Sequence, residues 1–145
     1  MFRGRYEHTL DSKGRLSIPA RFRETLSGDS DGRLVITTFD DCLIAYPYQE
    51  WCILEERIAA LPEFKRDTRS FLRFFYSSAS DCTIDKLGRI LVPQPLREYA
   101  KLEKEIIVVG VFKQFEIWSK DMWLSAEKEA SKDETGNMLD RLVFD

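Results

Sequence analysis

Two kinds of chemistry fit aspartate and arginine side chains that stand four residues apart. The chain has this spacing at Asp11 and Arg15, and again at Asp85 and Arg89. In one interpretation, each carboxylate pairs with its own arginine and staples a tight turn. In the other, the turn presents the guanidinium group to an anionic partner. We expect the structural role for the two aspartates, and the residues leave both roles open for the arginines.

A glycine stands before each arginine, at Gly14 and Gly88. Aspartate accepts hydrogen bonds from nearby backbone N–H groups, and glycine adopts a positive φ without a steric clash. Polar and apolar residues alternate on both sides of this segment, as they do in half-buried strands. Each copy therefore predicts a strand, a tight turn and a second strand. Pro19 and Pro93 then end the second strand and open a short helix.

The two segments are copies of one unit. Between residues 11–24 and 85–98, six charged or conformationally special residues coincide at an offset of 74 positions, and the apolar positions keep their character. A second match, at an offset of 72, relates residues 43–46 to 115–118 and Trp51 to Trp123. An internal duplication explains both matches. One unit alone buries too little of its surface, so we expect the copies to close into one pseudo-twofold β-barrel.

The hydrophobic pattern predicts an α+β protein that is mainly β, with flanking helices. Its organisation is a first repeat over residues 5–50, a helical connector over 51–78, a second repeat over 79–123 and a helical, charged tail over 124–145. β-branched and aromatic runs predict further strands at 34–38, 42–46, 105–111 and 115–118. Apolar residues three and four apart predict connector helices at 48–61 and 63–76. The tail predicts either fraying or a docking segment.

Composition is that of an ordinary globular protein, with 145 residues, 43% hydrophobic and 32% charged. The chain shows neither a secretory leader nor an apolar run of membrane-spanning length, which favours the cytoplasm. Three cysteines without Cys-x-x-Cys spacing and a single histidine, His8, predict no metal site and no cofactor. No pattern indicates a small-molecule substrate.

The net charge of −3 is unevenly distributed. Residues 1–23 contain six Lys and Arg against two acids, whereas residues 127–145 contain six acids against three cations. A basic patch is the electrostatic footprint of a polyanion site. A solvated surface with ordinary charge scatter is the alternative explanation.

The basic residues suggest a division of roles on double-stranded DNA. A guanidinium on a rigid turn, such as that of Arg15, suits the O6 and N7 atoms of guanine in the major groove. Phosphates would pair with Lys13, Arg3 and Arg5, and Arg21 is a further candidate. Arg89 is the equivalent DNA-binding candidate in the second copy. That copy has Lys86-Leu87 and Gln94-Pro95 where the first has Ser12-Lys13 and Ala20-Arg21, so its cationic character is weaker.

The repeated unit Asp-x-x-Gly-Arg-(apolar)-x-(apolar)-Pro resembles the SpoVT/AbrB swapped-hairpin DNA-binding domain. Two such units, in a chain that opens with Met1-Phe2-Arg3-Gly4, resemble the MraZ family over residues 1 to about 128. The resemblance implies a cytoplasmic, nucleoid-associated regulator of cell-division and cell-wall genes. It also implies repression of its own operon through promoter direct repeats, and assembly into a ring-shaped homo-oligomer. The Asp-x-x-x-Arg motif of the family maps onto the two pairs described above.

The residues suggest two other classes of function. An enzyme with Asp11 and Asp85 as paired carboxylates would resemble an aspartic protease, but such a dyad shares a proton, whereas an arginine four residues away keeps each carboxylate ionised. We therefore expect no enzyme. A protein-interaction module, either antitoxin-like or a ring scaffold, is the alternative to a DNA-binding regulator.

Overall fold

The computed structural model describes residues 1–144, with the side chain of Asp29 excepted. Asp145, the last residue of the predicted tail, lies outside the described residues. The first copy contains β1 (Arg5–Thr9), β2 (Arg15–Ser17), α1 (Ala20–Asp29), β3 (Arg33–Phe39) and β4 (Cys42–Pro47). The connector contains α2 (Tyr48–Ala59), α3 (Arg66–Phe71) and the π-helix η1 (Leu72–Tyr76). The second copy contains β5 (Ser80–Thr83), β6 (Arg89–Leu91), α4 (Gln94–Tyr99), β7 (Glu105–Val111) and β8 (Gln114–Ser119), followed by α5 (Lys120–Glu129) and α6 (Lys132–Phe144).

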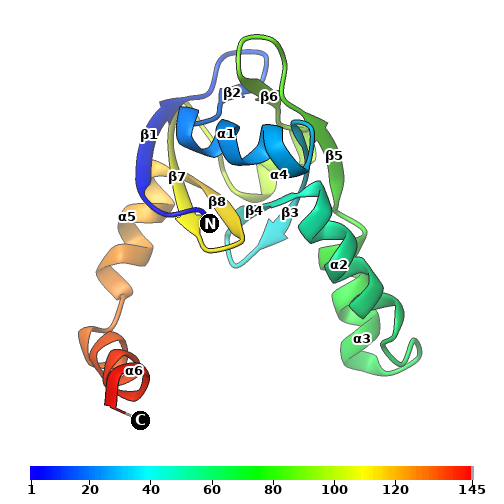
Figure 1. Cartoon of the computed structure of the whole chain (residues 1–145), viewed down its shortest axis with the longest axis vertical. Coiled ribbons are helices and arrows are strands. Elements are labelled where there is room, and N and C mark those ends of the chain that lie inside the picture. Colours follow the sequence, from blue (N-terminus) through cyan, green and yellow to red (C-terminus); the bar gives the residue numbers. More distant parts are fainter. Residues whose placement is uncertain (145) are drawn as a thin grey trace.

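The two copies exchange strands (Figure 1). One antiparallel sheet has the order β1-β7-β8-β4-β3-β5, and β2 pairs with β6 in a separate two-stranded sheet. Within each copy, the first two strands do not form a ladder with each other. Instead β1 pairs with β7 of the second copy, and β5 pairs with β3 of the first. Neither copy therefore completes its strand pairing alone.

The registers describe a pseudo-twofold axis. In the β2–β6 pair, Leu16 lies opposite Ile90, its equivalent at the offset of 74. In the β4–β8 pair, Ile44 lies opposite Glu116, its equivalent at the offset of 72. In both antiparallel pairs, a residue lies opposite its own equivalent in the other copy. A twofold axis that passes between the two strands at that point produces this arrangement.

The main core lies between the sheet, the β2–β6 pair and helices α1 and α4. Four pairs of equivalent apolar residues are buried there: Leu16 and Ile90, Ile18 and Val92, Phe22 and Leu96, Leu26 and Ala100. Phe2 meets Phe22 edge to face, with ring centroids 4.9 Å apart, and the ring of Phe115 lies tilted against Phe22 at 5.2 Å. The apolar equivalence seen in the sequence therefore reflects one shared core.

The other face of the sheet is covered by α2 and α5. Strands β3 and β7 have the same burial pattern, with four consecutive buried residues each, because both of their faces are covered. On this face Trp118, Ile107 and Cys42 pack against α5. The helices α2 with α3, and α5 with α6, extend as two arms away from the β2–β6 pair (Figure 1).

The predicted α+β class with an internal duplication is confirmed. The expectation of a mainly β chain is wrong, because the helices span more of the described residues than the strands do, and the barrel does not form as one continuous ladder. Among residues 1–144 the large sheet ends at β1 and β5, and only an isolated bridge, between Leu10 and Leu16, ties β1 to β2. The predicted connector helix at 63–76 is divided into α3 and η1, and the tail forms a helix. In the same described residues, no helix combines the length and the apolar composition that a membrane crossing needs.

Candidate nucleic-acid interface

Each Asp-x-x-x-Arg motif closes its own turn by three hydrogen bonds. Oδ1 of Asp11 accepts from the backbone N–H groups of Lys13 and Arg15 at 3.0 and 2.9 Å, and Oδ2 accepts from Nε of Arg15 at 2.6 Å. In the second copy, Oδ1 of Asp85 accepts from the N–H groups of Leu87 and Arg89, both at 2.9 Å. Its Oδ2 accepts from Nε of Arg89 at 3.1 Å. The stapling role expected for the aspartates is therefore present in both turns.

These bonds favour the ionised carboxylates. Hydrogen bonds from the backbone of Arg15 hold the pKa of Asp11 below its ordinary value, and the bonds from Arg89 do the same for the pKa of Asp85. Each carboxylate is committed to its own turn and its own arginine. The arrangement is the opposite of a dyad that shares one proton.

Two further arginines, outside the motif itself, contact the turn glycines. Gly14 and Gly88 are buried and have φ of +86° and +78°. The guanidinium of Arg97, from α4 of the second copy, covers Gly14, where an added Cβ would lie 2.8 Å from its Cζ. The side chain of Arg23, from α1 of the first copy, covers Gly88 in the same way.

Each turn is therefore completed by the opposite copy. Arg23 and Arg97 coincide in the duplicated sequence, and that coincidence was the available signal. Their placement over the other copy's glycine follows from the strand exchange, which a single sequence does not reveal.

The β2–β6 pair presents one face outward. Leu16 and Ile90 point into the core, so the alternating residues Arg15, Ser17 and Arg89 belong to the opposite face. Leu91, on that face too, is 59% exposed. A two-stranded β-ribbon of this kind fits the major groove of B-DNA. We call the β2–β6 pair with its two turns, residues 11–17 and 85–91, the ribbon.

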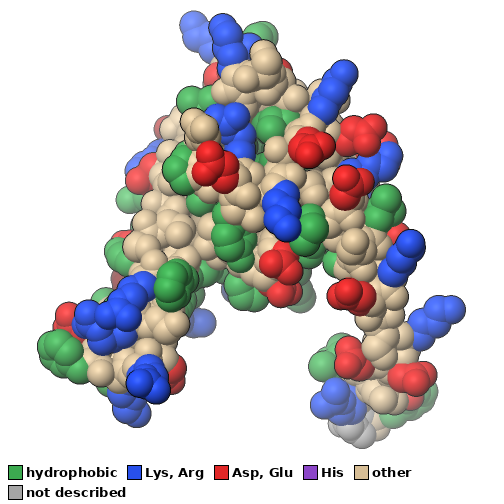
Figure 2. Space-filling model, turned by 180° about the vertical axis from the view of Figure 1, so that it is seen from behind, with side chains coloured by type: hydrophobic (Ala, Val, Ile, Leu, Met, Phe, Trp, Pro, Cys, Tyr) green, Lys and Arg blue, Asp and Glu red, His purple; other side chains and the backbone are tan. Residues whose placement is uncertain are grey.

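The ribbon lies at one end of the molecule, where both turns project side by side (Figure 1). Lys and Arg side chains project from this end in Figure 2. The exposed Lys13 and Lys86 stand in the two turns. Residues 11–15 and 85–89 each contain two cations and one carboxylate, so the turns carry equal charge. The second copy is less cationic outside its turn, where Ala79 stands in place of Arg5 and Pro95 in place of Arg21.

Arg3 and Arg5 are not brought together with Arg15. Arg5 begins β1, and the turn follows the other end of that strand. Its guanidinium pairs with Glu127 at 3.2 Å and lies 5.0 Å from the ring centroid of Trp123. Arg3 lies beside the far end of β7, since Gly110 donates to the carbonyl oxygen of Gly4 at 2.8 Å.

Cys42 and Cys82 are buried thiols, and burial raises the pKa of Cys82 to about 11. Within residues 1–144, no cluster of three or more His, Cys, Asp or Glu side chains is placed to hold a metal ion.

Together, the fold and the site define a class: a duplicated α+β protein whose copies exchange strands and build one cationic ribbon. A family model described as "MraZ protein, putative antitoxin-like" matches the chain twice, over residues 1–74 and 75–143. The chain belongs to the MraZ family, as the sequence resemblance predicted.

Close relatives are named transcriptional regulators. The chain is 50% identical to "Transcriptional regulator MraZ" of Desulforamulus reducens, over 98% of this chain and 100% of the relative. It is 49% identical to the protein of the same name from Ligilactobacillus salivarius, over 97% and 98% of the two chains. The Alkaliphilus metalliredigens protein of that name is 48% identical, over 98% and 99%. Membership of this family of regulators confirms the prediction that the chain is not an enzyme.

Proposed function

We propose that this chain is a sequence-specific transcriptional regulator that binds double-stranded DNA with the ribbon. The observation that carries the proposal is the pair of Asp-stapled turns, which hold Arg15 and Arg89 on one outward face of a two-stranded ribbon. The regulator names of its relatives support the same function.

Within the ribbon, we assign base recognition to Arg15 and Arg89. Each uses Nε for its own aspartate, so the two terminal amino groups are left to donate to guanine O6 and N7. Because the turn fixes the guanidinium before binding, little rotamer entropy is lost on contact. We assign Lys13 to a phosphate contact, which positions the protein without selecting a sequence. Arg3 and Arg5 are left out of the interface, because Arg5 begins β1 at the end away from the turn and Arg3 precedes it.

One ribbon makes few contacts, so we propose that a ring-shaped homo-oligomer binds direct repeats in promoter DNA. Copies in one ring raise the effective concentration of each ribbon at the next repeat. In the proposal the bound promoter is that of its own cell-division and cell-wall operon, and occupancy blocks transcription in the cytoplasm, at the nucleoid. The family resemblance supports this setting.

The test is a salt-dependent titration with DNA from immediately upstream of the gene and with a scrambled duplex. Arg15→Ala should cost about 1–3 kcal/mol of the preference for the promoter sequence. Lys13→Ala should weaken binding to both duplexes and lower the salt slope by about 1. Arg57→Ala, an exposed arginine on α2, is the control and should leave both titrations unchanged. If both ribbon variants bind the two duplexes as the wild type does, Arg15 and Lys13 are not part of the interface.

A further inference from the structure

The outward face of the ribbon breaks the pseudo-twofold symmetry at one pair of equivalent positions. Ser17 of the first copy and Leu91 of the second coincide at the offset of 74, but the first is polar and the second apolar. Leu91 is 59% exposed, whereas Ser17 is half-buried. Each follows a core residue, Leu16 or Ile90, so both belong to the face that carries the arginines. The two halves of the ribbon therefore offer different chemistry to one partner.

Folding gives no reason for a leucine at position 91. Its neighbours Ile90 and Val92 are 1% and 0% exposed, so they already fill the core side of β6. Alternation along the strand directs Leu91 away from that core, and the first copy forms the same strand with a serine there. A single exposed leucine is ordinary on a protein surface. What distinguishes Leu91 is the pair of arginines beside it.

Leu91 lies between the two arginines of the ribbon. It is directly opposite Arg15 in the β2–β6 register, and it follows Arg89 by two residues on the same face. Side chains directly opposite in an antiparallel pair have Cβ atoms about 4.5–5.5 Å apart. Of the four outward residues in this described ladder, Leu91 alone is apolar. A DNA duplex held by both guanidinium groups therefore covers this leucine.

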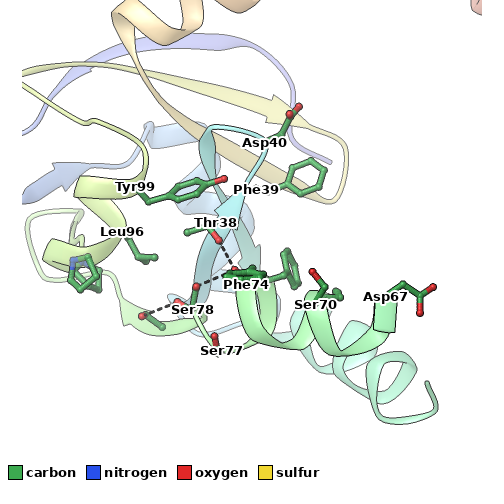
Figure 3. Close-up of a pocket in the computed structure, with 15 residues that line it drawn as sticks. Thr38, Phe39, Asp40, Asp67, Ser70, Phe74, Ser77, Ser78, Leu96 and Tyr99 are labelled. Atoms are coloured by element: carbon green, nitrogen blue, oxygen red, sulfur yellow. Dashed lines mark hydrogen bonds between the residues drawn. The ribbon is translucent and has the colours of Figure 1, made fainter. Parts of the chain in front are cut away.

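Leu91 is separate from the large apolar hollow beside α4 (Figure 3). That hollow has a volume of about 880 Å³, and Phe39, Phe74 and Tyr99 are among its walls. Pro93, two residues beyond Leu91, lines the hollow, but Leu91 is not among the described residues that do so. The exposed leucine therefore belongs to the surface of the ribbon.

The major groove of DNA offers one apolar group to such a side chain. Base edges there carry hydrogen-bond donors and acceptors, and only thymine adds a C5-methyl group. When a leucine packs against a polar edge, that edge loses water and gains no hydrogen bond. Against a thymine methyl group, both apolar surfaces leave water together. A serine hydroxyl has no such preference, because it both donates and accepts hydrogen bonds.

We propose that Leu91 selects a thymine in the DNA sequence that the ribbon recognises. The inference rests on the proposed function and adds an apolar contact to the two arginines assigned there. Successive bases are about 3.4 Å apart, so this thymine lies within about two base pairs of the guanine that Arg15 reads. No equivalent preference is expected beside Arg89, because Ser17 stands opposite it. The sequence read by one protomer is then not a palindrome, and its polarity suits direct repeats.

The test removes thymine methyl groups from the DNA one position at a time. In the duplex from immediately upstream of the gene, each thymine is replaced in turn by deoxyuridine, which lacks only the C5-methyl group and keeps every hydrogen bond. Wild-type protein should bind about fourfold more weakly when the contacted methyl group is lost, the usual effect of one buried methyl group. Leu91→Ser gives both copies the same residue, so it should bind the thymine and deoxyuridine duplexes equally at that position.

Two further variants make the result specific to this side chain. Leu124→Ser removes a leucine on α5 that is 44% exposed but outside the ribbon, and it should keep the wild-type loss with deoxyuridine. Ser17→Leu makes both halves of the ribbon apolar. It should also distinguish thymine from deoxyuridine, again by about fourfold, at the position that the ribbon's twofold axis relates to the first. That position is tested in a duplex altered to carry thymine there.

The possible results separate this inference from the proposed function. Leu91→Ser should melt like the wild type, because its side chain is exposed. If no thymine position shows the loss in the wild type, or if Leu91→Ser shows the same loss, the inference is wrong. It is equally wrong if Leu124→Ser abolishes the effect. A wild-type preference for the promoter duplex over the scrambled duplex, without any methyl effect, overturns this inference alone. Absence of that preference overturns the proposed function as well.

Discussion

The two copies are alike at the ribbon and different after their fourth strands. Both turns have the same staple, the same positive-φ glycine and the same covering arginine from the other copy. After β4 the chain continues through α2, α3 and η1 back to β5, whereas after β8 it continues through α5 and α6 to its end. The duplicated sequence thus builds the same turn in both copies. The segment that follows the fourth strand differs, and it decides which helix is covered by further chain.

The equivalent tryptophans Trp51 and Trp123 differ in burial because of this difference in connectivity. Trp51 on α2 is buried among Tyr46, Phe75 and Tyr76, with ring centroids 5.7, 6.1 and 6.0 Å away. Trp123 on α5 is half-buried, with Trp118 at 5.6 Å. The return path through η1 closes over the first tryptophan, and no equivalent segment follows the second among residues 1–144.

The largest expected effect tests this difference directly. Trp51→Ala should lower the free energy of unfolding by about 3–5 kcal/mol, the usual cost of removing a buried aromatic side chain. Trp123→Ala should cost about half as much, because part of that side chain is already exposed. Urea unfolding curves measure both. Equal losses would show that η1 adds nothing to the packing around Trp51.

Replacing the turn glycines should destabilise the two copies to a similar extent. Gly14→Ala and Gly88→Ala should each cost about 1–2 kcal/mol from the left-handed backbone conformation, and more where the covering guanidinium must move. Gly28→Ala in α1 is the control, since an added Cβ meets open space there and alanine favours the helix. Thermal melting of the three variants checks this. A neutral effect at either turn would contradict the tight covering by Arg97 or Arg23.

The smallest effect is a pH dependence shared by both turns. The pKa values of Asp11 and Asp85 are lowered in the folded chain, so their stabilisation is present above the ordinary value of 3.8 and is lost as the pH falls through the folded pKa. Stability should therefore fall as the pH drops below about 4. The double variant Asp11→Asn, Asp85→Asn keeps the acceptors for the backbone N–H groups and should show a shallower fall. Urea unfolding at each pH measures this dependence. If the free energy of unfolding falls equally steeply with pH in the wild type and the double variant, these carboxylates do not cause the loss of stability in acid.

Much of the local structure could be predicted because it depends on neighbouring residues. The Asp-Gly turns, the β-branched strands β3 and β7 and the helix that begins after Pro47 follow from turn chemistry and periodicity. Arg23 and Arg97 could not be placed, because their contacts lie in the opposite copy. The basic segment at the start of the chain predicts that Arg3 and Arg5 lie near Arg15, but the extended strand β1 separates them from it. The continuous helix predicted over 63–76 did not anticipate η1, whose carbonyls are satisfied by threonines of β3.

The sequence by itself determined that the chain is a duplication, that each copy has a stapled turn, and which apolar residues enter the core. These properties depend on residue type and short spacing, and both are written in the chain. Only the tertiary structure decided that the copies exchange strands, that their two turns meet in one ribbon, and that η1 closes over Trp51. Such properties depend on contacts between distant segments, where the gain from burying a shared core selects one pairing among several that the local patterns allow.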